Sequence, residues 1–171
     1  MENDGSLPAT IMGHDRIFWL GDLNYRLYMK DKLARELIRK KNWKELQMFD
    51  QLKKEQEQGG VFQGWKEGDI EFAPTYKYSV ELGNHYTGDE HAPFAPNTGE
   101  KRRTPAWCDR IMWYGNGIEQ LSYFRGESKF SDHRPVSGLF TSEIDVLKQI
   151  ITAAPFAEEV LPRNLNCQHD S

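Results

Sequence analysis

Apolar and polar positions recur along the chain with two different periods, which predicts helices in its first part and strands in its second. An apolar run at residues 16–20 ends at Gly21 and predicts a short buried strand. Over 31–41 and 42–58 the apolar residues recur at helical spacing, so each stretch predicts an amphipathic helix. The residues of these two apolar faces are Leu33, Leu37, Ile38, Trp43, Leu46, Phe49 and Leu52.

Polar side chains mark where the two helices begin. Asp31 and Asn42 stand at the expected N-caps, and Glu45 follows Asn42 at the spacing of a capping box. The basic residues of both helices are expected to form a solvated face. Contact with a membrane surface is the alternative, although Glu36, Glu45 and further acidic residues interrupt the positive charge.

After residue 60 the chain breaks into short segments separated by glycine and proline, a pattern typical of strands and loops. Alternating or continuous apolar runs predict strands at 70–72, 111–114, 118–124 and 136–140. A weak helix is expected from residue 142, followed by a loose polar tail. We therefore expect an α/β domain over 1–141 and a separate terminal stretch over 142–171.

The composition of the chain excludes several classes of protein. The 171 residues suffice for one domain with a core, and the formal net charge of −4 gives no overall attraction to nucleic acid or to anionic membranes. Cys108 and Cys167 lack metal-ligand spacing, so a reducing compartment is expected. No apolar run is long enough to cross a bilayer, and no signal peptide precedes the first strand. We expect a soluble, cytoplasmic protein.

The first candidate site follows the first strand. Asp22 and Asn24 lie two residues apart on extended backbone, so their side chains point the same way. A carboxylate can take a proton from water, and a carboxamide beside it can hold an oxygen atom. An ordinary turn is the alternative reading of these two residues.

A second candidate pair comes before the last strand. Asp132 and His133 are adjacent, and a carboxylate can fix the tautomer of an imidazole or bind a cation beside it. Adjacent residues on a strand face opposite ways, so cooperation requires a loop here, which Pro135 favours.

Cations gather at two further places. Lys77 stands between two tyrosines, where an ammonium and the phenol of Tyr76 can bind one phosphate; an ordinary edge strand is the alternative. Three cations at 101–103 precede a Pro-aromatic turn and a buried strand, which would hold alternate members in place. Asp109 and Arg110 lie at the mouth of that strand.

Four segments, at 19–27, 72–78, 101–111 and 131–136, together resemble the inositol polyphosphate 5-phosphatases, within the exonuclease, endonuclease and phosphatase superfamily. The run Pro-Ala-Trp-Cys-Asp-Arg is the most discriminating, and the intervening sequence is most similar to the plant branch. The resemblance implies an α/β fold, a partial deoxyribonuclease I-like four-layer sandwich of two packed β-sheets flanked by helices. It also implies that residues 1–141 are the C-terminal half of the catalytic domain, with the N-terminal half absent.

The resemblance implies catalytic roles for matching positions. Asp22 would activate water, and Asn24 would orient water or phosphate. Asp132 would hold and polarise His133, and could also approach the metal, while His133 would donate hydrogen bonds to phosphoryl oxygens. Asp109 would pair with a second active-site histidine. The implied cofactor is Mg2+, although the ligand set in this chain stays unknown.

The same resemblance implies a phosphate-binding cradle. Tyr76, Lys77, Lys101 and Arg103 would hold the 4-phosphate of the substrate, which places the 5-phosphate over the water. Arg102 falls between two of them and is expected to point elsewhere. The implied reaction is Mg2+-dependent hydrolysis of the 5-phosphate of phosphatidylinositol 4,5-bisphosphate or of related inositol polyphosphates.

The family's upstream asparagine, its Gln-Glu metal-binding segment and its second histidine have no counterpart in this chain. We therefore expect the chain alone to be inactive. Two alternatives are a non-catalytic phosphoinositide-binding fragment and a nuclease of the same superfamily. The expected partner is a phosphoinositide or a soluble inositol polyphosphate, with peripheral membrane contact, no transmembrane segment and no nucleic acid.

Overall fold

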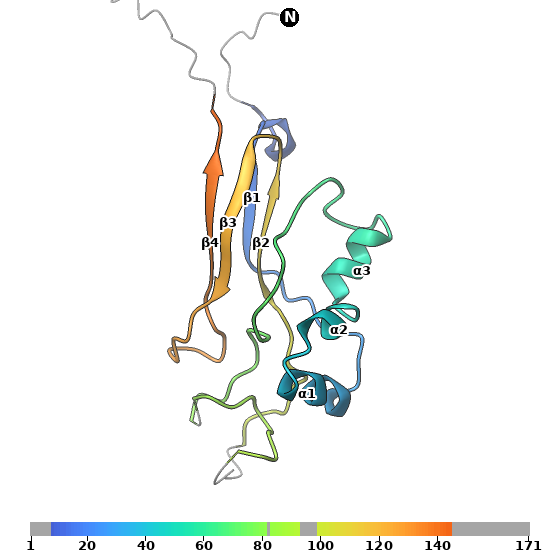
Figure 1. Cartoon of the computed structure of the whole chain (residues 1–171), viewed down its shortest axis with the longest axis vertical. Helices are drawn as coiled ribbons and strands as arrows, with labels where there is room; N and C mark the ends of the chain where they lie inside the picture. Colours follow the sequence, from blue (N-terminus) through green and yellow to red (C-terminus); the bar gives the residue numbers. More distant parts are fainter. Residues whose placement is uncertain (1–7, 82, 93–98, 145–171) are drawn as a thin grey trace, which may run out of the picture.

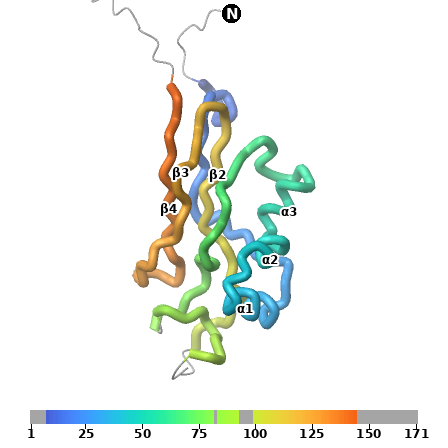
Figure 2. The backbone as a smooth tube through the Cα atoms, in the orientation of Figure 1, coloured from blue at the N-terminus to red at the C-terminus, as the bar shows by residue number. Residues whose placement is uncertain are grey.

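The computed structural model describes residues 8–81, 83–92 and 99–144. Two pairs of strands run along the long axis, and three helices lie to one side of them (Figure 1). Figure 2 shows the loops of residues 83–92 and 99–103 at the end of the molecule where α1 also lies. The elements are η1 (Ile11–Gly13), β1 (Ile17–Asp22), α1 (Asp31–Arg39), α2 (Trp43–Gln47), α3 (Gln51–Glu57), β2 (Asp109–Tyr114), β3 (Ile118–Arg125) and β4 (Val136–Ser142).

Two antiparallel sheets form the strand layer. β1 pairs with β2, and β3 pairs with β4. Phe140 of β4 joins the sheets, because its ring centroid lies 5.0 Å from that of Phe18 on β1 and 5.3 Å from that of Trp113 on β2. The expected α/β architecture with two packed sheets is confirmed, and so are the strands predicted after residue 60, except the one at 70–72.

That segment is not a strand, although Ile70 is buried. Its backbone bonds to a side chain instead of a neighbouring strand, because Gln47 Nε2 donates to the carbonyl oxygen of Ile70 over 2.8 Å. The terminal stretch predicted over 142–171 lies outside the described residues from residue 145 onward.

The stretch predicted as one helix over 42–58 is two. The N-cap at Asn42 is confirmed, with the Glu45 amide donating to Asn42 Oδ1 over 3.3 Å. The second bond of a capping box is not formed, because the Asn42 backbone amide donates to Leu37 and the Glu45 carboxylate accepts from the Asn42 side-chain amide. α2 then ends at Gln47, and Asp50 begins α3 by accepting a hydrogen bond from the amide of Lys53. The cap at Asp31 is wrong by one residue, since the N-cap of α1 is Lys30.

Strand β1 is more exposed than its apolar sequence predicts. Phe18 and Trp19 are each 42% exposed, and Leu20 is 64% exposed. Among the described residues β1 pairs with β2 along one edge only, so its other edge offers free backbone donors and acceptors. The expectation of a buried strand is wrong here for that reason.

A buried ion network joins the helices to β2. The Arg110 guanidinium lies 3.0 Å from Asp50 and 2.6 Å from Glu67, and its side chain is 0% exposed. Tyr123 donates to Glu67 over 2.9 Å. Arg110 is therefore structural, because it neutralises two carboxylates in the interior.

Cys108 lies in the core beside Leu27 and Trp107. Burial raises the pKa of its thiol to about 12. In a Cys167→Ser variant, which isolates this thiol, we expect negligible reaction with a disulfide reagent at about pH 8, because the thiolate is the reactive form. Unfolding in denaturant should make the reaction fast. Fast labelling of the native protein, measured as release of the coloured thiol, would contradict this burial.

No helix in the part of the chain that the structure describes has the length and apolar character needed to cross a bilayer.

Candidate active site

The register of β1 and β2 brings two carboxylates together. Asp22 and Asp109 are directly paired, at the end of β1 and the beginning of β2. Directly opposed residues of antiparallel strands project from the same face of a sheet, so both carboxylates face the same space. His133 joins them from the loop before β4, and one ligand atom from each residue lies within 4.8 Å of the others.

Asp109 holds the histidine ring. His133 Nδ1 lies 2.9 Å from Asp109 Oδ2 and 3.2 Å from Oδ1. A carboxylate only accepts hydrogen bonds, so Nδ1 carries the proton that it donates, and Nε2 is left for a substrate. Thr75, which is buried, donates from Oγ1 to the same Asp109 oxygen over 2.6 Å and fixes the carboxylate.

Two sequence predictions are wrong on this point. Asp132 does not hold His133, and Asp109 contacts His133 itself, not a second histidine. Asp132 instead accepts a hydrogen bond from the Lys77 ammonium over 2.8 Å. The pKa of Asp132 is lowered mainly by this hydrogen bond, which also raises the pKa of Lys77. The physical reason is that the side chains of adjacent residues point in different directions.

Asn24 lies beside Asp22 in the left-handed region, with φ 60°. Its backbone amide donates to Asp22 Oδ1 over 2.9 Å, which restrains that carboxylate. Arg26 donates to Asn24 Oδ1 and lies over the ring of Tyr76, 4.4 Å from the centroid. The Tyr76 ring lies 4.7 Å from that of His133. The side chains of 22, 24, 26, 76 and 133 therefore form one continuous surface.

Arg26 and Thr75 are the residues that sequence reasoning missed. The alternation of Asp22, Asn24 and Arg26 at every second position is a signal that could have found the arginine. Thr75 gives no such signal, because its role depends on a contact with Asp109, 34 residues later.

The proposed cradle is only partly assembled. A bridge between Tyr76 and Ala106 places the segment that carries Lys101 and Arg103 next to Tyr76. Both cations are exposed, and no ion pair among the described residues holds them. Arg102 points elsewhere, as expected, because it pairs with Asp31 at 2.8 Å and Glu90 at 2.9 Å.

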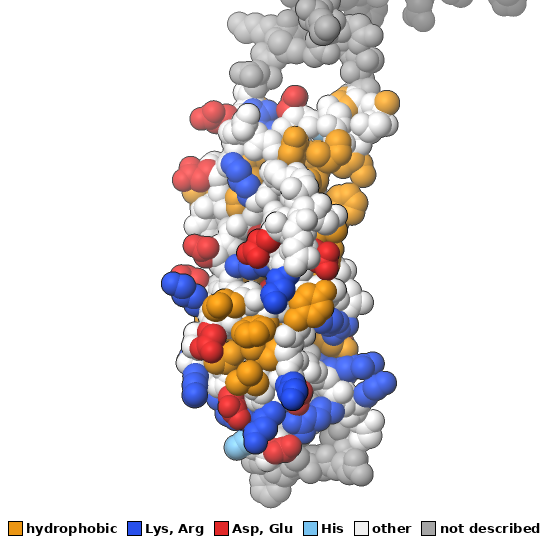
Figure 3. Space-filling view, turned by 90° about the vertical axis from the view of Figure 1, so that its right-hand side faces the viewer, with side chains coloured by type: hydrophobic (Ala, Val, Ile, Leu, Met, Phe, Trp, Pro, Cys, Tyr) orange, Lys and Arg blue, Asp and Glu red, His pale blue; other side chains and the backbone are white. Residues whose placement is uncertain are grey.

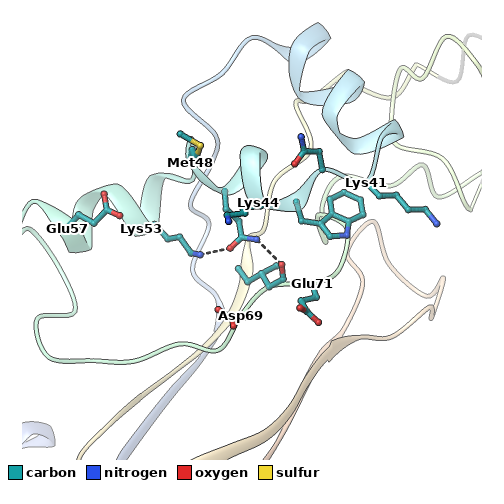
Figure 4. Close-up of a pocket in the computed structure, with 11 residues that line it drawn as sticks. Lys41, Lys44, Met48, Lys53, Glu57, Asp69 and Glu71 are labelled. Atoms are coloured by element: carbon teal, nitrogen blue, oxygen red, sulfur yellow. Dashed lines mark hydrogen bonds between the residues drawn. The ribbon is translucent and has the colours of Figure 1, made fainter.

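Two cavities lie near these elements. One of about 390 Å³ opens beside His133 and Asp109 and is also lined by Leu20 and Phe130. A larger one of about 800 Å³ lies between α2, α3 and residues 69–71, away from the site (Figure 4). Lysines of the helices face Asp69 and Glu71 across this second cavity.

A family model described as Endonuclease/Exonuclease/phosphatase family 2 matches residues 4–139. The chain therefore belongs to this family. Curated relatives of the chain include plant inositol polyphosphate 5-phosphatases, which confirms the resemblance drawn from the sequence motifs.

Two of these relatives come from Arabidopsis thaliana. The chain is 49% identical to type IV inositol polyphosphate 5-phosphatase 7 over 166 residues, covering 93% of this chain and 27% of the relative. It is 55% identical to type I inositol polyphosphate 5-phosphatase 4 over 142 residues, covering 83% of this chain and 25% of the relative. The chain thus spans about a quarter of the length of these relatives.

Solved structures agree on the fold. The inositol polyphosphate 5-phosphatase domain of SpSynaptojanin, in complex with inositol (1,4)-bisphosphate and calcium ion, matches with a TM-score of 0.62 and 30% identity. The match covers 78% of this chain and 38% of that domain. Cimex nitrophorin, in a ferrous NO complex, matches with a TM-score of 0.59 and 36% identity, over 77% of this chain and 43% of that one. The fold is therefore shared by proteins with different ligands, and the site must decide the function.

Proposed function

We propose that this chain carries the proton-transfer groups and the phosphate-binding rim of a Mg2+-dependent inositol polyphosphate 5-phosphatase. The rim is the cradle named above, formed by Tyr76, Lys77, Lys101 and Arg103. The reaction would be hydrolysis of the 5-phosphate of phosphatidylinositol 4,5-bisphosphate or of a related inositol polyphosphate. The observation that carries the proposal is the convergence of Asp22, Asp109 and His133 within 4.8 Å, with the Tyr76 ring 4.7 Å from that of the histidine.

The roles of the three groups follow from their surroundings. Asp22 is exposed at the end of β1, so its carboxylate can accept a proton from an attacking water. His133 is oriented through Nδ1 by Asp109, and a protonated ring can donate from Nε2 to a phosphoryl oxygen as negative charge develops. Asn24 lies next to Asp22, to which its backbone amide donates, and its carboxamide would orient water or a phosphoryl oxygen.

The donor set suits magnesium. Mg2+ in proteins is commonly bound by one or two carboxylates, with waters and substrate phosphates completing its shell. Asp22 offers a carboxylate to the ion, whereas Asp109 accepts hydrogen bonds from His133 and Thr75, and Asp132 accepts one from Lys77. When bound there, the ion would polarise the phosphoryl group.

The rim would select a polyphosphate. The Tyr76 ring lies beside that of His133, and the Lys77 ammonium lies 5.8 Å from the centroid of the Tyr76 ring. Lys101 and Arg103 lie exposed on the adjoining segment. Charge-assisted hydrogen bonds to a second phosphate would fix the ring of the inositol and so place its 5-phosphate over Asp22. Both a lipid headgroup and a soluble inositol phosphate fit this chemistry.

We expect the chain alone not to release phosphate. The sheet that carries Asp22 has two strands among the described residues, and the apolar side chains of β1 remain partly exposed. The experiment compares this chain with a fusion in which the part of type I inositol polyphosphate 5-phosphatase 4 that precedes its match is joined to it. With Mg2+ and inositol 1,4,5-trisphosphate, the fusion should release phosphate and the chain should not.

Either of two results would contradict this proposal. Robust release by the chain alone, abolished by Asp22→Ala and by His133→Ala, would refute its inactivity. A folded fusion that releases no phosphate, or releases it equally well in Asp22→Ala, would refute the assignment of the reaction.

A non-catalytic function is the second candidate, favoured by the exposed and unpaired Lys101 and Arg103 among the described residues. It predicts headgroup binding that weakens with salt, survives chelation of Mg2+ and falls by roughly tenfold or more in Lys77→Ala, which removes one charge-assisted contact. A fusion that binds the trisphosphate but does not hydrolyse it would favour this candidate.

A further inference from the structure

Positive charge is concentrated on the first two helices. Residues 30–44 contain seven lysines and arginines and two acidic residues, although the whole chain has a net charge of −4. Six of the seven cations are exposed. We name them the cationic helix face: Lys30, Lys32, Arg39, Lys40, Lys41 and Lys44.

No ion pair among the described residues neutralises the charge of this face. Asp31, the acidic residue nearest its beginning, is already shared by Arg35 and Arg102, each 2.8 Å away. Asp89 and Glu90 line a surface hollow together with Lys32 and Arg39, and Asp69 and Glu71 line another with Lys41 and Lys44. The face therefore keeps a net positive potential, which these neighbouring carboxylates reduce.

Apolar side chains are interspersed with these cations. Leu33 on α1 is 46% exposed, and Met48 at the end of α2 is 68% exposed. In Figure 3, which views the helix side of the molecule, the Lys and Arg side chains gather mainly over its lower half, where orange apolar side chains also reach the surface. A helix surface that mixes lysines with exposed apolar side chains is suited to the interface of a lipid bilayer.

The cationic helix face also adjoins the phosphate-binding rim. Arg35 of α1 donates to the carbonyl oxygen of Arg103 over 2.9 Å, and Arg102 donates to Asp31 over 2.8 Å. These contacts join α1 to the segment that carries Lys101 and Arg103. Docking of α1 on a surface would therefore bring this rim close to the same surface.

We infer that the cationic helix face docks this protein on bilayers rich in anionic lipid. The attraction is electrostatic and needs no inositol lipid, so this inference stands apart from the proposed hydrolysis. It is also distinct from recognition of the substrate, because it uses none of the residues around Asp22 and His133. An anionic bilayer is favoured over a nucleic acid because exposed Leu33 and Met48 have an apolar phase to enter only in the bilayer.

The test measures co-sedimentation of the full chain with phosphatidylcholine vesicles that contain or lack phosphatidylserine, and no inositol lipid. We expect binding only with phosphatidylserine, and weaker binding at higher salt. Each cation lost at such a surface lowers partitioning by about fivefold, so Arg39→Gln with Lys40→Gln should lower it by roughly thirtyfold.

The matched control is Lys66→Gln with Lys129→Gln, which removes the same charge from two exposed lysines outside the helices. We expect this control to bind as well as the unmodified chain, apart from a small effect of net charge. Circular dichroism of both variants checks that the fold is kept. The inference is overturned if the chain does not bind phosphatidylserine vesicles, if both double variants lose binding equally, or if the cations bind duplex DNA and not vesicles.

Discussion

Replacing Arg110 by methionine is expected to lower the free energy of unfolding by about 3–5 kcal/mol, which makes it one of the most damaging single changes in this chain. The side chain is 0% exposed and lies 3.0 Å from Asp50 and 2.6 Å from Glu67. Its loss leaves two carboxylates in the interior without a counter-charge. Because Asp50 also caps α3, the disturbance should reach that helix.

Urea denaturation followed by circular dichroism measures the effect of Arg110→Met. The matched control is Arg102→Met, whose side chain is 44% exposed and whose ion pairs are expected to contribute about 1 kcal/mol or less. Adding Glu67→Gln to Arg110→Met should recover part of the stability, since it removes one of the uncompensated charges. Equal effects of Arg110→Met and Arg102→Met would contradict a buried network.

Replacing either Asp22 or His133 by asparagine is expected to lower kcat of the active fusion by about 10²–10⁴-fold, the usual contribution of a general acid or base. Asp109→Asn should have an effect of similar kind, because it removes the carboxylate that orients the imidazole. The double variant Asp22→Asn with His133→Asn should be little worse than the single ones, because groups that act as a unit are not additive.

The measurement for these variants is phosphate release under saturating substrate, with Lys66→Gln as a control distant from the site. We expect the control to match the unmodified fusion. Losses of less than about threefold in Asp22→Asn and His133→Asn would fall far below the range for proton transfer and would refute their roles.

Much of the local structure could be predicted because it depends on local pattern. The apolar runs that become β2, β3 and β4 and the N-cap at Asn42 are each contained within a few residues. The break between α2 and α3 was missed because Asp50 is held by Arg110, 60 residues further along the chain. The exposure of β1 was missed because sequence pattern does not report how many neighbours a strand has.

The candidate site could likewise be predicted only where it depends on local sequence. Asp22, Asn24, Asp109 and His133 could be nominated from residue type and from resemblance, but their pairing could not. The contact between Asp109 and His133 depends on the register of β1 against β2 and on the position of the loop before β4. Asp132, adjacent to His133 in sequence, was the wrong partner for the ring because a distant lysine holds it.

The likeness to Cimex nitrophorin illustrates why the site carries the argument. That protein matches with a TM-score similar to that of the synaptojanin domain, yet its structure is a ferrous NO complex. A shared fold therefore does not distinguish a phosphatase from another ligand-binding protein. The carboxylate pair, the oriented imidazole and the adjoining cations of this chain are what favour phosphate chemistry.

The central claim of the proposal is that His133 and Lys77 bind the same inositol polyphosphate. Titration of the chain with inositol 1,4,5-trisphosphate, followed through the ring proton of His133 by NMR, tests it most directly. His133→Asn assigns the resonance. The account predicts a saturable shift of that resonance in the unmodified chain, with weaker affinity in Lys77→Ala and unchanged affinity in Lys66→Ala. A His133 resonance that stays fixed while the trisphosphate is added to saturation would contradict it.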